Sequence, residues 1–89
     1  MVNVQGKWAL ITGASRGIGR LIAEFMADQG CNLILHSRSL EHLDGVLTEV
    51  KAKGVQAYGV AAELSNLDEV DRMLAEIDRL GVQVDFVLN

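Results

Sequence analysis

Apolar residues in this chain form two patterns, short continuous runs and longer stretches in which they recur every three or four positions. Runs of largely apolar residues occur at 7–11, 32–37 and 85–89, and a more polar run occurs at 55–61. Short apolar runs bounded by glycine or polar residues are typical of parallel strands that are covered on both faces. The pattern therefore predicts four strands, and the more polar one is expected near an edge of the sheet.

Between these runs, apolar side chains recur at the spacing of one helix face. This spacing predicts helices over residues 17–29, 40–53 and 67–80. Each predicted helix is closed by a glycine, the residue that most readily ends a helix in the left-handed conformation. These glycines are Gly30, Gly54 and Gly81. The alternation of strands and helices predicts an α/β fold, in which right-handed crossovers build a parallel sheet.

Polar residues before the second and third predicted helices suggest how those helices begin. Ser39 is expected to cap the second helix, and Ser65 with Asp68 forms a start similar to a capping box for the third. Gly45 lies inside the second predicted helix, where glycine costs about 1 kcal/mol relative to alanine. That cost does not change the predicted helix.

Composition limits the classes of function. The chain has 89 residues, 49% of them apolar and 22% charged, with no proline, which fits one compact domain. Its net charge of -4 is spread along the chain, so nucleic acid and anionic membranes are not expected partners. No apolar run approaches the roughly 18 residues of a membrane helix. The single cysteine, Cys31, suits a small core residue in a protein of the reducing cytoplasm.

The histidines do not suggest a metal site. Neither His36 nor His42 has a cysteine, aspartate or second histidine at metal-ligand spacing, so no metal site is predicted. We expect His36 to lie at the rim of a ligand site and His42 in the first turn of a helix. Trp8, in the first predicted strand, is expected in the core.

A glycine-rich octet between the first strand and the first helix carries the strongest functional signal. It reads T-G-A-S-R-G-I-G from Thr12 to Gly19. Gly13 is expected to make a tight turn, Gly17 to leave room for a diphosphate, and Gly19 to let the helix pack closely on the sheet. The alternative is a loop that serves only the packing of helix on strand. The spacing G-x-x-x-G-x-G differs from the common G-x-G-x-x-G fingerprint.

The octet resembles the T-G-x-x-x-G-x-G signature of the short-chain dehydrogenase/reductase family. The resemblance implies a Rossmann-type doubly wound parallel sheet, of which this chain forms the part βαβαβαβ with strand order 3-2-1-4. Residues 1–89 are expected to be the N-terminal part of a single NAD(P)-binding domain. The ligand crevice is expected where the first and fourth strands end.

The end of the second strand bears on the choice of cofactor. NAD-specific domains usually place a carboxylate there, whereas this chain reads His36-Ser37-Arg38-Ser39. Arg38 and Ser37 suit a 2′-phosphate, and Arg16 in the glycine turn adds a second cation. Family members that prefer NADP(H) usually carry a basic residue at both positions. We therefore expect NADP(H) over NAD(H), the alternative being that both arginines are solvated surface charges.

Further positions follow from the resemblance. Glu63-Leu64 stands where the family has an acid and an aliphatic residue near the adenine ring, and for Glu63 a capping or surface role is an equal alternative. Asn89 matches the first residue of the family's N-N-A-G, and Ser15 can hydrogen-bond a phosphate. The predicted cofactor-binding residues are Gly13, Ser15, Arg16, Gly17, Ile18, Gly19, Ser37, Arg38, Glu63, Leu64 and Asn89.

No catalytic residue is predicted in this chain. The family's chemistry uses a serine and a Tyr-x-x-x-Lys pair that would lie beyond residue 89, and Tyr58 has no lysine four residues later. The intact enzyme is expected to reduce a small carbonyl, or oxidise an alcohol, by hydride transfer and to form a homo-oligomer.

Two other functions compete with this interpretation. The chain is alternatively a non-catalytic nucleotide-binding or oligomerising half-domain, with an unpaired edge at its fourth strand. A P-loop is disfavoured because Arg20 and Leu21, and not a lysine followed by serine or threonine, come after Gly19.

Overall fold

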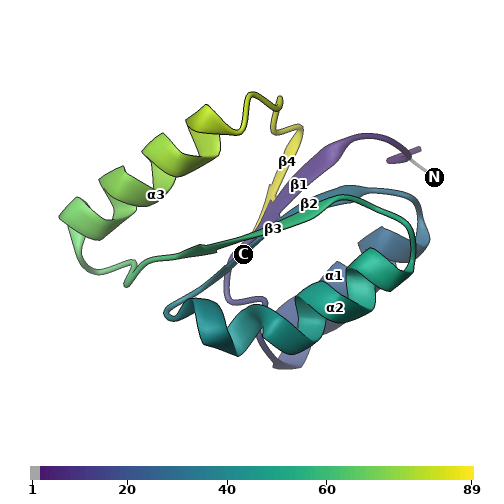
Figure 1. Ribbon diagram of the computed structural model, residues 1–89, viewed down its shortest axis with the longest axis horizontal. Helices are drawn as coiled ribbons and strands as arrows, with labels where there is room; N and C mark the ends of the chain where they lie inside the picture. Colours follow the sequence, from purple (N-terminus) through teal and green to yellow (C-terminus); the bar gives the residue numbers. More distant parts are fainter. Residues whose placement is uncertain (1–2) are drawn as a thin grey trace.

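The computed structural model describes residues 3–89 and contains one parallel sheet (Figure 1). Its strands are β1 (Trp8–Ile11), β2 (Asn32–Ser37), β3 (Ala57–Ala61) and β4 (Phe86–Leu88). The strand order is β3-β2-β1-β4, and every neighbouring pair is parallel. This order confirms the predicted topology, including the edge position of the more polar strand β3.

Helices cover both faces of the sheet. The α-helices are α1 (Gly17–Asp28), α2 (Asp44–Ala52) and α3 (Leu67–Arg79), and a short 3-10 helix, η1 (Leu40–Leu43), precedes α2. In Figure 1, α1 and α2 lie on one side of the sheet and α3 lies on the other. Both faces of the central strands are therefore buried, which explains why β1 and β2 are continuous apolar runs.

Two clusters of buried side chains form the core. Because side chains alternate along a strand, Leu33 and Leu35 of β2 pack with α1 and α2, whereas Ile34 packs on the side of α3. Trp8 belongs to the α3 side and stacks on Tyr58, with ring centroids 5.8 Å apart. Cys31 is buried on the other side, and burial raises the pKa of its thiol. The expected core positions of Trp8 and Cys31 are thus confirmed.

The beginnings of the second and third helices differ from the prediction. Ser39 precedes η1, but its hydroxyl makes no capping bond, and α2 begins only at Asp44. The backbone carbonyl of Ser39 instead accepts the amide of His42, which closes the 3-10 turn. The 3-10 turn therefore occupies the place of the predicted first helical turn.

The prediction that Ser65 caps α3 is wrong. Asn66 is the cap, and its Oδ1 accepts the amide of Glu69 at 3.2 Å. The hydroxyl of Ser65 donates instead to Oε1 of Glu63, also at 3.2 Å. Asn66 is an equally good capping residue, so sequence alone does not separate the two positions.

No helix within residues 3–89 is long and apolar enough to cross a membrane.

The ends of the α-helices follow the prediction more closely than their starts. A glycine with positive φ follows each of them, at Gly30, Gly54 and Gly81. The loops that begin at these glycines return the chain to the amino ends of the strands, so the opposite edge of the sheet carries the connections described next.

Candidate functional site

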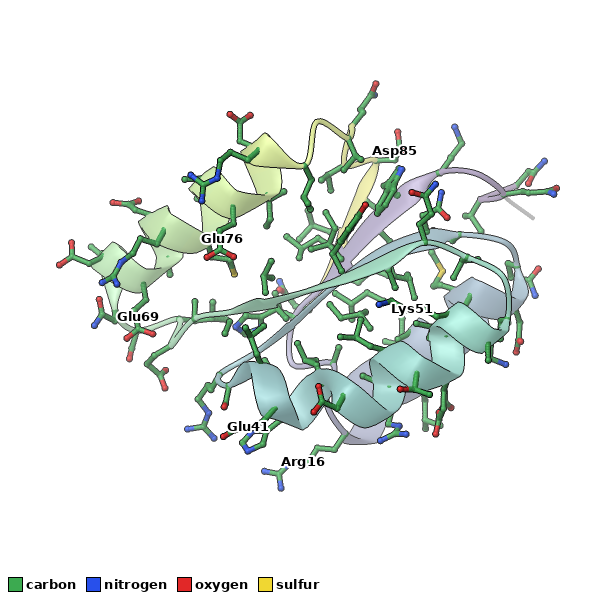
Figure 2. All side chains as sticks on the ribbon, in the orientation of Figure 1. Arg16, Glu41, Lys51, Glu69, Glu76 and Asp85 are labelled. Carbon is green, nitrogen blue, oxygen red and sulfur yellow. The ribbon has the colours of Figure 1, made fainter. Side chains whose placement is uncertain are left out.

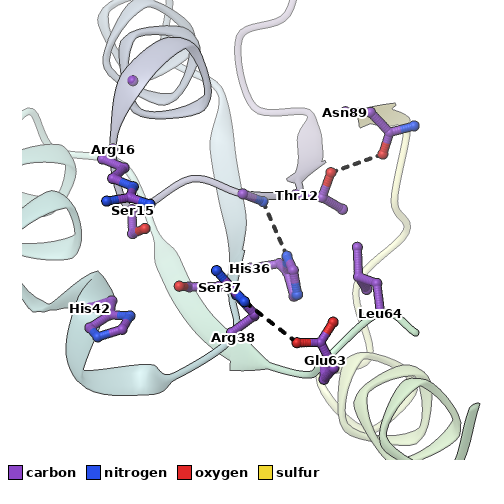
Figure 3. Close-up of a pocket in the computed structure, with 12 residues that line it drawn as sticks. Thr12, Ser15, Arg16, His36, Ser37, Arg38, His42, Glu63, Leu64 and Asn89 are labelled. Carbon is purple, nitrogen blue, oxygen red and sulfur yellow. Dashed lines mark hydrogen bonds and ion pairs between the residues drawn. The ribbon is translucent and has the colours of Figure 1, made fainter. Parts of the chain in front are cut away.

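A cavity of about 940 Å³ opens at the carboxyl ends of the four strands (Figure 3). This volume lies within the range of small-molecule and cofactor sites. The residues that line it are Thr12, Gly13, Ser15, Arg16, Gly17, His36, Ser37, Arg38, His42, Glu63, Leu64 and Asn89. They include nine of the eleven predicted cofactor-binding residues. The sequence prediction and the cavity therefore converge on one place.

The two predicted residues outside the lining are Ile18 and Gly19. Ile18 is 72% exposed on α1. Gly19 acts through packing, because a Cβ atom built there would lie 2.2 Å from the carbonyl oxygen of Gly13. Only glycine allows this approach. A close packing role is thus confirmed for Gly19, although its nearest neighbour is the turn and not the sheet.

The glycine turn carries the chain from β1 into α1 with two left-handed residues. Gly13 has φ 61° and Gly17 has φ 62°, a region in which residues with a side chain are strained. No atom lies within 4 Å of the place where either glycine would carry a Cβ. Open space therefore borders the backbone of the turn on the cavity side.

The N-terminus of α1 faces the cavity as a possible source of hydrogen-bond donors. Arg16 is the N-cap residue, has extended backbone and makes no capping bond with its side chain. The first amides of a helix have no partner within the helix, and the helix dipole adds partial positive charge there. Figure 2 shows Arg16 reaching outward from the body of the protein beyond α1. This end of α1 has the properties of an anion site.

His36 lies beneath the turn and joins it to β3. The residue is 3% exposed. Its Nδ1 accepts the amide of Gly13 at 3.1 Å, and its Nε2 lies 2.8 Å from the carbonyl oxygen of Ala62. The amide of Ala14 also donates to the carbonyl of His36, at 2.8 Å. The predicted rim position for His36 misses these contacts. The sequence offers a signal for the burial of His36, which lies in the apolar run of β2, but none for its partners.

Arg38 and Glu63 face each other at the opening of the cavity (Figure 3). A nitrogen of the guanidinium of Arg38 lies 3.8 Å from Oε2 of Glu63, and the side chains are 73% and 44% exposed. Oε1 of Glu63 also accepts the hydroxyl of Ser65. Ser37, in contrast, is buried, and its carbonyl accepts the amide of Ala62. Two predicted site residues, Arg38 and Glu63, are thus in contact with each other. The contacts of Glu63 with Arg38 and Ser65 also fit the alternative surface role for Glu63.

Asn89 is held at the far side of the cavity by Thr12. The hydroxyl of Thr12 donates to Oδ1 of Asn89 at 2.9 Å, and the amide of Thr12 donates to the carbonyl of Leu88. Thr12 begins the glycine octet but was not among the predicted binding residues. Its hydroxyl places Asn89 beside the glycine turn.

These features define the class of the domain. Strand β1 has β2 on one side and β4 on the other. The sheet therefore grows in one direction through β2 and β3 and in the opposite direction through β4, and the glycine turn lies at the point where the direction changes. Open α/β sheets bind ligands at such a switch point, outside the carboxyl ends of the strands. The fold and the glycine turn are those of a Rossmann-type domain.

The sequence matches the short chain dehydrogenase family over residues 7–89, and the chain belongs to this family. It is 40% identical over 84 residues to the 3-oxoacyl-(acyl-carrier-protein) reductase FabG of Staphylococcus aureus, a match that covers 93% of this chain and 34% of that protein. The chain therefore spans about a third of the length of this relative.

Solved structures show the same fold. A metagenomic short-chain oxidoreductase in complex with NADP has a TM-score of 0.87 and 31% identity, over 97% of this chain and 39% of that one. L-sorbose reductase from Gluconobacter frateurii, complexed with NADPH and L-sorbose, also has a TM-score of 0.87 and 31% identity, over 96% and 33% of the two chains. Both likenesses extend over nearly the whole of this chain.

Proposed function

We propose that this chain is the cofactor-binding part of a short-chain oxidoreductase and that it binds NADP(H) in preference to NAD(H). The observation that carries the proposal is Arg38, which follows β2 at the mouth of the cavity, where an NAD-specific domain usually has a carboxylate. A guanidinium in that position can donate a fork of hydrogen bonds to a 2′-phosphate.

The diphosphate of the cofactor would bind at the start of α1. The free amides of that first helical turn supply donors, and the absence of side chains at Gly13 and Gly17 lets a ligand approach the backbone. Ser15 lines the same wall and offers a hydroxyl, and Arg16 adds positive charge. The donor set therefore fits a diphosphate.

The adenosine end would lie between β2 and β3. Arg38 and Ser37 would hold the 2′-phosphate, Leu64 offers apolar surface for adenine, and Glu63 can accept a bond from the adenine amino group. Asn89 would border the cofactor on the side of β4. In this arrangement Arg38 exchanges its exposed contact with Glu63 for one with the phosphate.

Such a cofactor supplies or accepts the hydride, and this chain's residues bind and orient it. Relatives solved with NADP and NADPH support this assignment. We place residues 1–89 in the N-terminal part of a single NAD(P)-binding domain, in a cytoplasmic protein that reduces a small carbonyl or oxidises an alcohol. The edge of β4 would pair with further strands of that domain or with a second copy.

Calorimetric titration of the full chain with NADPH and NADH, at the same ionic strength, tests the proposal. We expect NADPH to bind at least about tenfold more tightly, because charge-assisted hydrogen bonds contribute about 1.5–3 kcal/mol. The preference should shrink as salt screens the charges. Equal affinities, or tighter binding of NADH, would overturn the cofactor assignment.

A further inference from the structure

One imidazole ties together two chain segments that form opposite parts of the cavity. His36, on β2, reaches Gly13 after β1 with Nδ1 and Ala62 after β3 with Nε2. A backbone amide can only donate and a carbonyl can only accept, so Nδ1 carries the lone pair and Nε2 carries the hydrogen. The two contacts therefore select one tautomer of the neutral ring.

We infer that His36 is a positioning residue for the cofactor site, because it fixes the glycine turn relative to the loop that begins at Ala62. This inference rests on the proposed binding of a nicotinamide dinucleotide. Gly13 precedes Ser15 and Arg16 of the diphosphate wall, and Ala62 directly precedes Glu63 and Leu64. A single ring thus sets the separation of the two walls that the cofactor must span.

His36 also determines which amides of the turn remain for a phosphate. The Gly13 amide donates to its ring, and the Ala14 amide donates to its carbonyl at 2.8 Å. These two donors point toward β2, which leaves the amides at the start of α1 for an anion. Loss of the ring would leave the Gly13 amide without its partner and free it to turn away from β2.

Asn32 provides a matched control at the other end of β2. Its Oδ1 accepts the amide of Gln56 at 2.9 Å, so it also joins β2 to the chain of β3 by a side-chain bond. Asn32 lies outside the cavity lining. Replacing it removes a side-chain-to-backbone bond between the chains of β2 and β3 without touching either wall of the cavity.

The experiment compares NADPH and NADH affinities of the full chain with those of three variants. His36→Phe keeps a ring without nitrogen, His36→Asn keeps an acceptor near the position of Nδ1, and Asn32→Ala is the control. We expect His36→Phe to weaken both dinucleotides by the same factor, about three- to tenfold. The factor is shared because both dinucleotides carry the diphosphate. His36→Asn, which keeps the acceptor for Gly13 but not the contact with Ala62, should bind more tightly than His36→Phe and less tightly than the wild type. Asn32→Ala should match the wild-type affinity.

Unchanged binding by a folded His36→Phe variant would overturn the inference, as would an equal loss of affinity in Asn32→Ala. Failure of the wild-type chain to bind either dinucleotide would instead refute the proposed function. Nitrogen NMR of the free chain tests the positioning contact independently. We expect a protonated Nε2, an unprotonated Nδ1, and a Gly13 amide signal that moves in His36→Phe but not in Asn32→Ala. The opposite tautomer would contradict the inference.

Discussion

The two walls of the cavity are held in place by different means. The glycine turn is anchored by bonds to His36, which is 3% exposed, and by the close packing of Gly19 on Gly13. The opposite wall shares the contact of His36 with Ala62, but its rim carries the exposed Arg38–Glu63 pair, whose nearest charged atoms are 3.8 Å apart and whose side chains are 73% and 44% exposed. Exposed pairs of this kind contribute little to stability.

This difference matches what each wall would recognise. A diphosphate is common to NAD(H) and NADP(H), so a rigid turn can bind it in either cofactor. The 2′-phosphate distinguishes the two, and an adjustable pair of side chains can exchange one anion for another at small cost. We therefore expect the affinity for both dinucleotides to depend on the buried wall and the selectivity between them to depend on the exposed rim.

The largest effect is expected from Gly19→Ala, which breaks the buried wall. The added Cβ would lie 2.2 Å from the Gly13 carbonyl oxygen, so the backbone must shift. We expect a loss of about 1–3 kcal/mol in urea unfolding and loss of binding of both dinucleotides. The control is Gly45→Ala in α2, where the Cβ would lie 3.5 Å from the guanidinium of Arg20. It should leave stability unchanged or raise it by up to about 1 kcal/mol. Wild-type stability in Gly19→Ala would contradict this account.

Arg38→Asp tests the exposed wall. It removes the donor proposed for the 2′-phosphate and replaces it with a repelling carboxylate. In parallel titrations, the affinity for NADPH should fall at least about tenfold, while the affinity for NADH should change less than about twofold. Lys51→Asp makes the same change of charge on α2, away from the cavity, and should affect neither (Figure 2). An equal loss of affinity for both cofactors in Arg38→Asp would mean that Arg38 contacts a group that NADPH and NADH share, and not the 2′-phosphate.

Glu63→Gln should sharpen selectivity in the opposite direction. The substitution releases Arg38 from a competing carboxylate but keeps an oxygen that can accept a bond from adenine. We expect NADPH to bind about two- to fivefold more tightly, with NADH little changed. Glu76→Gln on α3 is a control outside the cavity lining (Figure 2). Weaker NADPH binding by Glu63→Gln would mean that its negative charge supports the cofactor.

The last prediction needs no substitution and concerns the buried cluster where β1 and β2 begin, at the end of the sheet opposite the turn. Cys31 belongs to the same buried cluster as Ala14 of the turn, and burial raises the pKa of its thiol. Less thiolate at a given pH means slower alkylation. At pH 8 we expect iodoacetamide to label the folded chain on the order of 100-fold more slowly than the chain in urea. Comparable rates would show that this part of the core opens readily.

The sequence by itself determined the order of elements, the parallel sheet and the place of the cavity. Apolar runs, helical spacing and terminal glycines are local patterns, and the glycine octet marks the turn because its backbone demands the absence of side chains. The expected strand order, 3-2-1-4, came from the resemblance of that octet to the family signature. Helix starts were less determined, as Ser39 and Ser65 show, because adjacent polar residues can cap equally well.

Only the tertiary structure decided how the two walls are held. His36 makes both ring contacts with residues more than twenty positions away along the chain, with separations of 23 and 26 residues, so no local pattern reveals them. The pairing of Arg38 with Glu63 likewise requires β2 and β3 to end side by side. The sequence indicates which groups are present near the ligand. Their partners are set by the parallel sheet, which brings distant strand ends to one edge.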